Sequence, residues 1–121
     1  MGKEEINQKA FGNMTPEEQI YYVTEKTVEA LKTVYDPEIP VNIYDLGLIY
    51  KIDYDPEEKN LHVDMTLTAP SCPAVDFLVE DARMKLAGIE GPEKLDLQLV
   101  FEPEWNKDMM SEEAKLELGF L

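Results

Sequence analysis

Cysteine and histidine are almost absent from this sequence of 121 residues, since Cys72 and His62 are its only examples. A single cysteine excludes an internal disulfide. A single histidine without a Cys/His cluster argues against a zinc site, so His62 is expected to be a solvated residue on the polar face of a strand. A thiol without a partner in its own chain is typical of a reducing compartment, and the expected location is therefore cytoplasmic.

Basic residues are also scarce. Lys and Arg total 11 against 26 Asp and Glu, so the formal net charge is −15. This negative field repels phosphate backbones and anionic lipids, which argues against nucleic acid and membrane surfaces as partners. No apolar run is long enough to span a membrane, and none follows Met1 as a signal peptide would require. Basic protein surfaces and metal ions remain compatible partners.

Familiar catalytic motifs are missing as well. The sequence has no glycine-rich phosphate loop, no dinucleotide fingerprint and no zinc-protease pattern. It also has no Gly-x-Ser-x-Gly nucleophile elbow. A Cys–His nucleophilic pair would need His62 beside Cys72, which nothing in the sequence demands. Because no complete catalytic constellation is visible, the protein is not expected to be an enzyme.

The pattern of apolar residues predicts one compact α/β (α+β) domain over residues 15–121, preceded by a flexible N-terminal tail over residues 1–14. The expected order is helix, strand, strand, helix, strand, helix, with a small mixed three-stranded sheet packed with helices. The first two strands should form an antiparallel hairpin, and the third should lie parallel to the second. The expected ranges are 16–35, 73–88 and 111–119 for helices, and 49–54, 61–67 and 95–101 for strands.

Three of these elements show a regular spacing of apolar residues. Thr15 is expected to cap the first helix, with Pro16 in its first turn. The apolar face of that helix should consist of Ile20, Val23, Thr27, Leu31 and Val34. In the first strand, one face should carry Tyr50, Ile52 and Tyr54, and in the second strand the buried face should carry Leu61, Val63, Met65 and Leu67.

Cys72 is the only soft ligand and the only strong nucleophile in the chain. It stands immediately before Pro73, at the expected start of the second helix. Free backbone N–H groups and the helix dipole stabilise an anion at such a position, so the thiol is expected to act as a thiolate. The alternative is a small residue that only fits near a helix cap.

Two other residues are candidates for the same site. Thr68 lies four residues before Cys72 and could place its hydroxyl beside the thiol, or it could be an ordinary threonine at a strand end. Asp45 precedes Leu46-Gly47 at the start of the hairpin. It could be a metal ligand or a hydrogen-bond acceptor, but its default role is to fix a turn.

A further candidate surface lies near the C-terminal end, where Trp105 is followed by Met109 and Met110. Flexible methionines near a tryptophan are often core packing. The same residue types are also enriched in surfaces that bind partner proteins. The sequence favours neither interpretation over the other.

Three segments together resemble a known family. They are DPEIPVNIYDLGLI at residues 36–49, TAPSCP at residues 68–73, and the tail residues Pro103-Glu104-Trp105, Asp108 to Ser111 and Leu118-Gly119. In this order they resemble the metal–sulfur cluster biosynthesis family, the SufT/PaaD-like iron–sulfur cluster assembly domains. The resemblance spans residues 24–121. The sequence departs from the family at Tyr44, where an aliphatic residue is common, and at Ser71, where glycine is frequent, and neither change removes a candidate group.

The resemblance implies a compact α/β domain with a role in maturing iron–sulfur proteins. It implies that Asp45, Thr68 and Cys72 carry the function and lie together at one end of the sheet, and that Glu38 belongs to the same signature. One cysteine cannot hold a cluster alone, since clusters are normally bound by a full set of thiolates. Cys72 is therefore expected to bind iron or an iron–sulfur cluster transiently, and no tightly bound cofactor is expected.

The favoured hypothesis is an iron–sulfur cluster assembly factor that helps to deliver clusters to client apoproteins and works with other assembly proteins. One alternative is a metal-free adaptor that docks clients, and another is a maturation factor for one oxygenase complex. A further alternative is an enzyme with Cys72 as nucleophile and His62 or Asp45 as its base. A homodimer would allow two chains to share a cluster, although only the ligand count suggests it.

Overall fold

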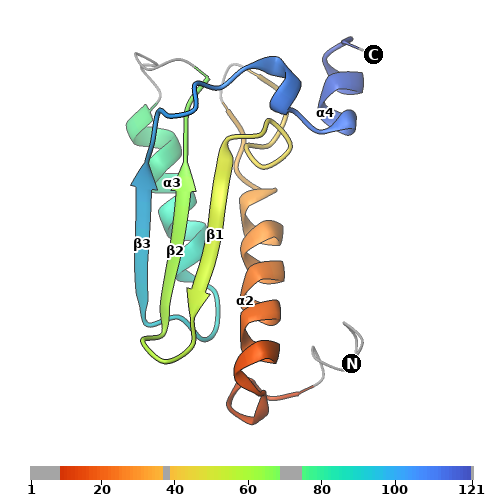
Figure 1. Cartoon of the computed structure of the whole chain (residues 1–121). Helices are drawn as coiled ribbons and strands as arrows, with labels where there is room; N and C mark the ends of the chain where they lie inside the picture. Colours follow the sequence, from red (N-terminus) through yellow and green to blue (C-terminus); the bar gives the residue numbers. More distant parts are fainter. Residues whose placement is uncertain (1–8, 37–38, 69–74, 121) are drawn as a thin grey trace.

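The computed structural model describes residues 9–36, 39–68 and 75–120. Its elements are the 3₁₀ turn η1 (Phe11–Asn13), helix α2 (Pro16–Leu31), strands β1 (Ile49–Asp55) and β2 (Asn60–Met65), helix α3 (Val75–Ala87), strand β3 (Lys94–Leu99), the 3₁₀ turn η2 (Lys107–Met109) and helix α4 (Glu112–Glu117). Figure 1 shows them in one α/β domain, which confirms the expected order of helices and strands. None of the helices in these ranges has the length and apolar character needed to cross a membrane.

The sheet follows from the alternation of apolar residues in β2. Leu61, Val63 and Met65 are completely buried on one face of the strand. β2 is the central strand, antiparallel to β1 and parallel to β3, as the sequence predicts. Helices α2 and α3 contact each other, and they also contact β1 and β3 respectively. The two helices therefore cover one face of the sheet and leave the other face open (Figure 1).

The pairing of β1 with β2 is interrupted by a β-bulge. Ile49 lies opposite Met65, but Lys51 lies opposite Asp64, so one extra residue, Tyr50, is inserted in β1. The pairing is therefore irregular at Tyr50, although burial still alternates from Tyr50 to Tyr54 as predicted. The phenol of Tyr50 donates a hydrogen bond to the backbone carbonyl of Pro103, at 2.8 Å.

Helix α2 begins as predicted and ends earlier. The Thr15 hydroxyl accepts a hydrogen bond from the Glu18 N–H, and the Glu18 carboxylate accepts one from the Thr15 N–H, which forms a capping box. The helix ends at Leu31 because the following chain turns back, where Tyr35 bridges to Asn42. Val23, Thr27, Leu31 and Val34 are buried as expected, whereas Ile20 is 39% exposed.

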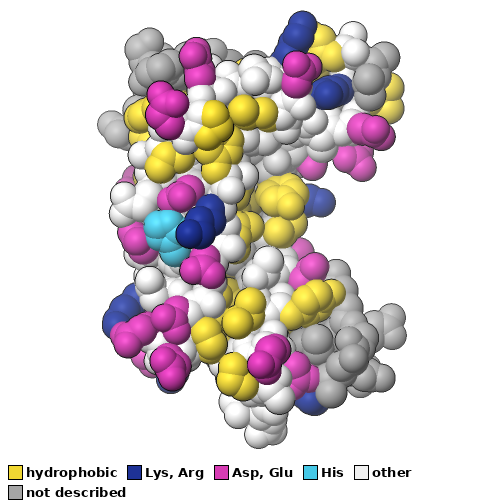
Figure 2. Space-filling model, viewed as in Figure 1, with side chains coloured by type: hydrophobic (Ala, Val, Ile, Leu, Met, Phe, Trp, Pro, Cys, Tyr) yellow, Lys and Arg dark blue, Asp and Glu magenta, His cyan; other side chains and the backbone are white. Residues whose placement is uncertain are grey.

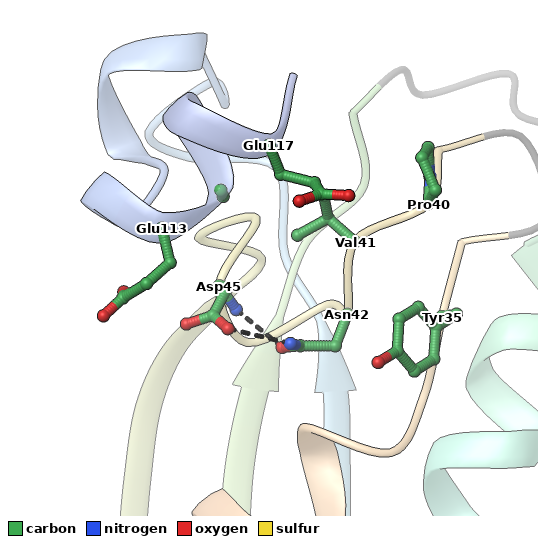
Figure 3. A pocket seen from close by; sticks show the side chains of 8 residues that line it. Tyr35, Pro40, Val41, Asn42, Asp45, Glu113 and Glu117 are labelled. Carbon is green, nitrogen blue, oxygen red and sulfur yellow. Dashed lines mark hydrogen bonds between the residues drawn. The ribbon is translucent and has the colours of Figure 1, made fainter. Parts of the chain in front are cut away.

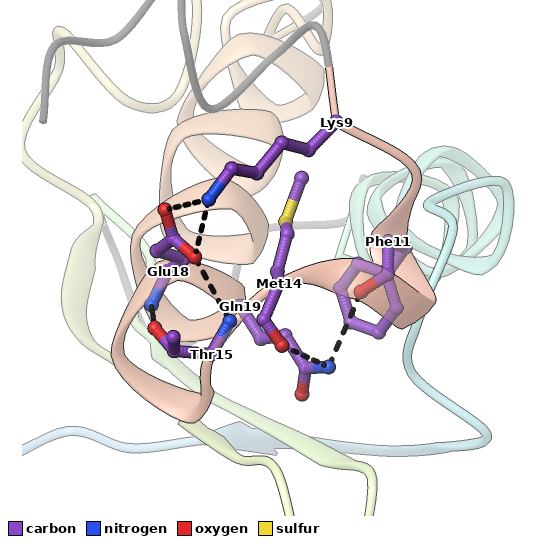
Figure 4. Close-up of polar contacts among 6 residues, drawn as sticks. All are labelled: Lys9, Phe11, Met14, Thr15, Glu18 and Gln19. Atoms are coloured by element: carbon purple, nitrogen blue, oxygen red, sulfur yellow. Dashed lines mark hydrogen bonds and ion pairs between the residues drawn. The ribbon is translucent and has the colours of Figure 1, made fainter.

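Residues 9–14 are packed against the domain, although the sequence assigned them to a flexible tail. Met14 is buried, and the ring of Phe11 contacts the rings of Tyr22 and Tyr54. The side chain of Gln19 donates hydrogen bonds to the carbonyls of Phe11 and Met14. Figure 4 shows how these contacts fold the segment over the start of α2.

Lys9 adds an ion pair to this segment. Its ammonium lies 2.8 Å from the Glu18 carboxylate, within the same capping box. The hydrogen bond from Lys9, followed by that from the Thr15 backbone, lowers the pKa of Glu18. One carboxylate therefore caps the helix and also ties the preceding segment to it (Figure 4).

The open face of the sheet carries His62 in a network of carboxylates. His62 Nδ1 lies 2.8 Å from Asp96 on β3, and its Nε2 lies 2.7 Å from Asp64 on β2. The side chain is 25% exposed on the polar face of the strand, as expected, but both of its ring nitrogens are engaged by carboxylates. Figure 2 shows the ring on the surface of the sheet, flanked by acidic side chains.

This network makes stability depend on pH. The hydrogen bond to Asp96, supported by Asp64 and opposed by burial, raises the pKa of His62. A raised pKa means that the protonated ring contributes stability below the pKa of the unfolded chain, and that this contribution is lost as pH rises through the folded pKa. The hydrogen bonds from Gln98 and His62 lower the pKa of Asp96, so its contribution is lost only as pH falls through that lowered pKa.

We therefore expect His62→Gln to lower the urea midpoint more at about pH 5.5 than at about pH 9, on either side of the ordinary histidine pKa. Glutamine keeps a polar side chain and removes the titratable charge. Unfolding curves of both proteins at the two pH values measure the difference. An equal loss at both values would show that the charge of His62 contributes nothing.

Candidate functional site

The candidate residues Asp45 and Thr68 are brought to one end of the sheet. Ile49 at the start of β1 lies opposite Met65 at the end of β2, and the Thr66 N–H donates to the Leu48 carbonyl at 2.7 Å. Asp45 precedes this point in the chain and Thr68 follows it, and both are half-buried. Cys72 and Glu38, the other two predicted site residues, lie outside the described residues.

Asp45 is held by Asn42 in a closed pair of hydrogen bonds. The Asn42 side-chain amide donates to the Asp45 carboxylate, and the Asn42 side-chain oxygen accepts from the Asp45 N–H, both at 2.8 Å. The Asp45 carbonyl in turn accepts from the Ser111 N–H, also at 2.8 Å. Asp45 thus fixes the loop before β1, which was its default role, and its carboxylate stays at the surface of a pocket (Figure 3).

The C-terminal segment is fastened to this same loop. The indole N–H of Trp105 donates to the carbonyl of Leu46 at 2.7 Å. Gly47 has a positive φ of 81°, and the backbone of Met109 packs directly against its Cα. Met110 is 6% exposed and belongs to the hydrophobic core. In this structure Trp105, Met109 and Met110 hold the tail on the domain, while a role in contacting a partner remains a prediction.

Two pockets meet at Pro40, between the loop and α4. The first is an acidic pocket lined by Tyr35, Pro40, Asn42, Asp45, Glu113 and Glu117. The second, here called the apolar pocket, has Lys107 as its one charged residue and is otherwise lined by Ile39, Pro40, Leu46, Trp105, Met110, Leu118 and Phe120. In Figure 3 the carboxylate of Glu117 lies over the acidic pocket, and Asp45 and Tyr35 stand on opposite sides of it.

No metal centre is built into the described part of the chain. Within residues 9–36, 39–68 and 75–120, no group of three or more His, Cys, Asp or Glu residues is arranged to hold a metal ion. Both ring nitrogens of His62 are engaged by carboxylates, which does not support it as the general base of a nucleophilic site. The chemistry that the described residues offer is therefore hydrogen bonding, negative charge and apolar contact.

Sequence reasoning missed several residues of these pockets. The spacing of Asn42 and Asp45, three residues apart before Gly47, is typical of a side-chain turn and could have indicated their pairing. Glu113 and Glu117 lie one helical turn apart on α4, which places them on the same face. Nothing local indicates that this face lies beside Asp45, because the contact depends on how the C-terminal segment folds back.

The chain is similar to known proteins of iron–sulfur cluster assembly and maturation. The sequence pattern of the family described as "Iron-sulfur cluster assembly protein" matches residues 24–96, more than half of the chain. A Porphyromonas gingivalis protein named Fe-S protein maturation auxiliary factor is 62% identical over 97 residues, which cover 80% of this chain and 91% of the relative. The Staphylococcus aureus Fe-S protein maturation auxiliary factor SufT is 41% identical over 86 residues, which cover 71% of this chain and 97% of the relative.

The fold also has a solved counterpart. The crystal structure of a domain of unknown function, DUF59, from Bacillus anthracis superimposes with a TM-score of 0.78 at 31% sequence identity. The superposition covers 87% of this chain and 99% of the Bacillus anthracis chain. The similarity thus extends over the sheet, its helices and nearly the whole length of that chain.

Proposed function

The chain belongs to the iron–sulfur cluster assembly protein family, and on that premise we propose that it is an iron–sulfur protein maturation factor that helps to deliver clusters to client apoproteins. The observation that carries this function is the near full-length similarity to proteins named Fe-S protein maturation auxiliary factor. The cluster is cargo in this role and not a resident cofactor. Its partners are client apoproteins and other assembly proteins, and its compartment is the cytoplasm.

Cys72 is the residue that we propose as the transient ligand of iron or of the cluster. It is the only cysteine in the chain, so any cluster bound through it takes its other ligands from a second copy or from a partner protein. Asp45 and Thr68, at the end of the sheet that leads toward residue 72, would shape this site. Glu38 belongs to the same proposed site through its place in the family signature.

A metal-free adaptor is the second candidate, and one observation favours it. In the described residues, the end of the sheet that carries Asp45 also carries two pockets suited to protein contacts. An adaptor would dock clients without binding iron. The two candidates therefore differ in whether the thiol of Cys72 is needed.

A complementation assay separates them. In cells that lack the gene, we expect the activity of a labile iron–sulfur dehydratase to fall, and the wild-type protein to restore it. Cys72→Ala should fail to restore it although the variant is folded and equally abundant, because it removes the only thiol in the chain. Ser71→Ala, which changes the neighbouring residue and keeps the thiol, is the matched control and should restore activity.

Other outcomes of this assay are also decisive. Full rescue by Cys72→Ala would overturn the ligand role and leave the adaptor as the function. If cells without the gene show no loss of activity in any iron–sulfur enzyme, the maturation role itself is wrong. A loss confined to one oxygenase would show a factor dedicated to that complex.

A further inference from the structure

The carboxylates of the acidic pocket have no basic partner in the part of the chain that the structure describes. Within the described residues, Asp45, Glu113 and Glu117 form no ion pair with lysine or arginine. Asp45 is held by a neutral amide, which leaves its charge uncompensated. Glu117 lies in the last turn of α4, where a carboxylate opposes the helix dipole. Glu113 lies in the first turn of α4, where a carboxylate stabilises the helix. Neither ion pairing nor the helix dipole explains the charge of Glu117, and ion pairing does not explain that of Asp45.

The walls of the acidic pocket suit a guanidinium group. The ring of Tyr35 is part of the lining, and this residue is 53% exposed. In Figure 3 the ring stands across from Asp45 with Glu117 above the space between them. A planar guanidinium can stack on an aromatic ring while its N–H groups donate to carboxylates, whereas an ammonium does this less well.

The apolar pocket adjoins this acidic pocket, because Pro40 lines both. It has a volume of about 420 Å³, and its walls include the rings of Trp105 and Phe120 and the side chain of Leu118. Phe120 is 52% exposed, with the ammonium of Lys107 lying 5.2 Å from its ring centre. Such a pocket fits one large apolar side chain, the kind of group that anchors protein contacts.

We propose that the two pockets form one docking surface for a segment of a partner protein that carries an arginine close to a large apolar side chain. The arginine occupies the acidic pocket and the apolar side chain occupies the pocket beside it. The net charge of −15 favours the approach of such a basic segment. This inference rests on the proposed function, because it specifies how a maturation factor holds its client or assembly partner.

A set of labelled peptides tests the surface with the full-length protein. Each peptide carries one Arg and one Phe in a glycine and serine background, with the spacing between them varied, and binding is followed by fluorescence polarisation. We expect at least one spacing to bind, and its Arg→Glu and Phe→Ala versions to bind much more weakly. Addition of the peptide should change the NMR chemical shifts of Tyr35, of the Trp105 indole and of the residues of α4.

Protein variants then locate the contacts. The double variant Glu113→Gln/Glu117→Gln should weaken binding about tenfold, as expected for the loss of a charge-assisted hydrogen bond. Phe120→Ala should also weaken it, through the apolar pocket. The matched control is Glu57→Gln/Glu90→Gln, which makes the same change in net charge at two exposed carboxylates outside both pockets and should bind normally.

Equal weakening in both double variants would overturn the proposal, since the peptide would then respond only to net charge. Binding by no peptide of the set would also overturn it, as would a sedimentation result showing that a second copy of the chain occupies the surface. The rescue assay is read separately. If the protein restores activity in the deletion strain but binds no peptide, the docking surface alone is rejected. If the deletion strain shows no loss of iron–sulfur enzyme activity, the maturation role is rejected.

Discussion

Replacing Gly47 with alanine is expected to lower the free energy of unfolding by about 3 kcal/mol or more. The φ of Gly47 is +81°, a conformation that strains any residue with a Cβ. A Cβ placed there would also clash with the carbonyl oxygen of Met109 and would lie 2.8 Å from its carbonyl carbon. These are backbone atoms, so no side-chain rotation can relieve the contact.

The tail cannot move away without breaking other contacts. The Trp105 indole is bound to the Leu46 carbonyl, and the Ser111 N–H is bound to the Asp45 carbonyl. We therefore expect the variant to release the C-terminal segment. Trp105 is the only tryptophan, so its fluorescence should shift to longer wavelength as the ring becomes exposed, and urea unfolding should give the loss of stability.

Gly119 provides a control that separates the two causes. Its φ is +82°, nearly that of Gly47, but a Cβ there would meet nothing within 4 Å. Gly119→Ala should therefore lower stability only by the backbone strain, about 1 kcal/mol. If the two variants unfold at the same urea concentration, the contact between Gly47 and Met109 does not stabilise the fold.

Sequence patterns predicted those parts of the fold that depend on residues close together in the chain. The alternation from Leu61 to Met65 identifies a strand with one buried face, and Thr15 followed by Pro16 identifies the start of a helix. The sequence does not reveal that α2 ends at Leu31, because the bridge between Tyr35 and Asn42 depends on the next turn of chain. The bulge at Tyr50 is invisible for a similar reason, since it is a property of the pairing with β2.

The candidate site was predictable to the same extent. Antiparallel pairing of β1 and β2 places Asp45 and Thr68 at one end of the sheet, whereas Cys72 lies outside the described residues, so the site that the resemblance implied stays a prediction. Trp105 was visible as a candidate, but its hydrogen bond to Leu46 joins residues that are 59 positions apart. The acidic pocket requires the same folding back of the tail, because it brings Glu113 and Glu117 to Asp45.

The second large loss of stability is expected at Gly91, against which residues 9–14 pack. Gly91 has a φ of +116°, and a Cβ there would lie 2.5 Å from Cζ and 2.7 Å from Cε2 of Phe11. We expect Gly91→Ala to lower the free energy of unfolding by about 2–3 kcal/mol, because backbone strain is added to the displacement of the Phe11 ring. That ring contacts Tyr22 and Tyr54, so its displacement also loosens the start of α2.

A double-mutant cycle with Phe11→Ala tests this cause. Phe11→Ala removes the ring that the new methyl group would strike, so Gly91→Ala should then lower stability only by the backbone strain. We expect the two changes together to destabilise less than the sum of the single changes, with a coupling of about 1 kcal/mol or more. Urea unfolding followed by circular dichroism measures all four proteins. Strictly additive losses would mean that Phe11 does not pack on Gly91, and that residues 9–14 are held by Lys9, Met14 and Gln19 without it.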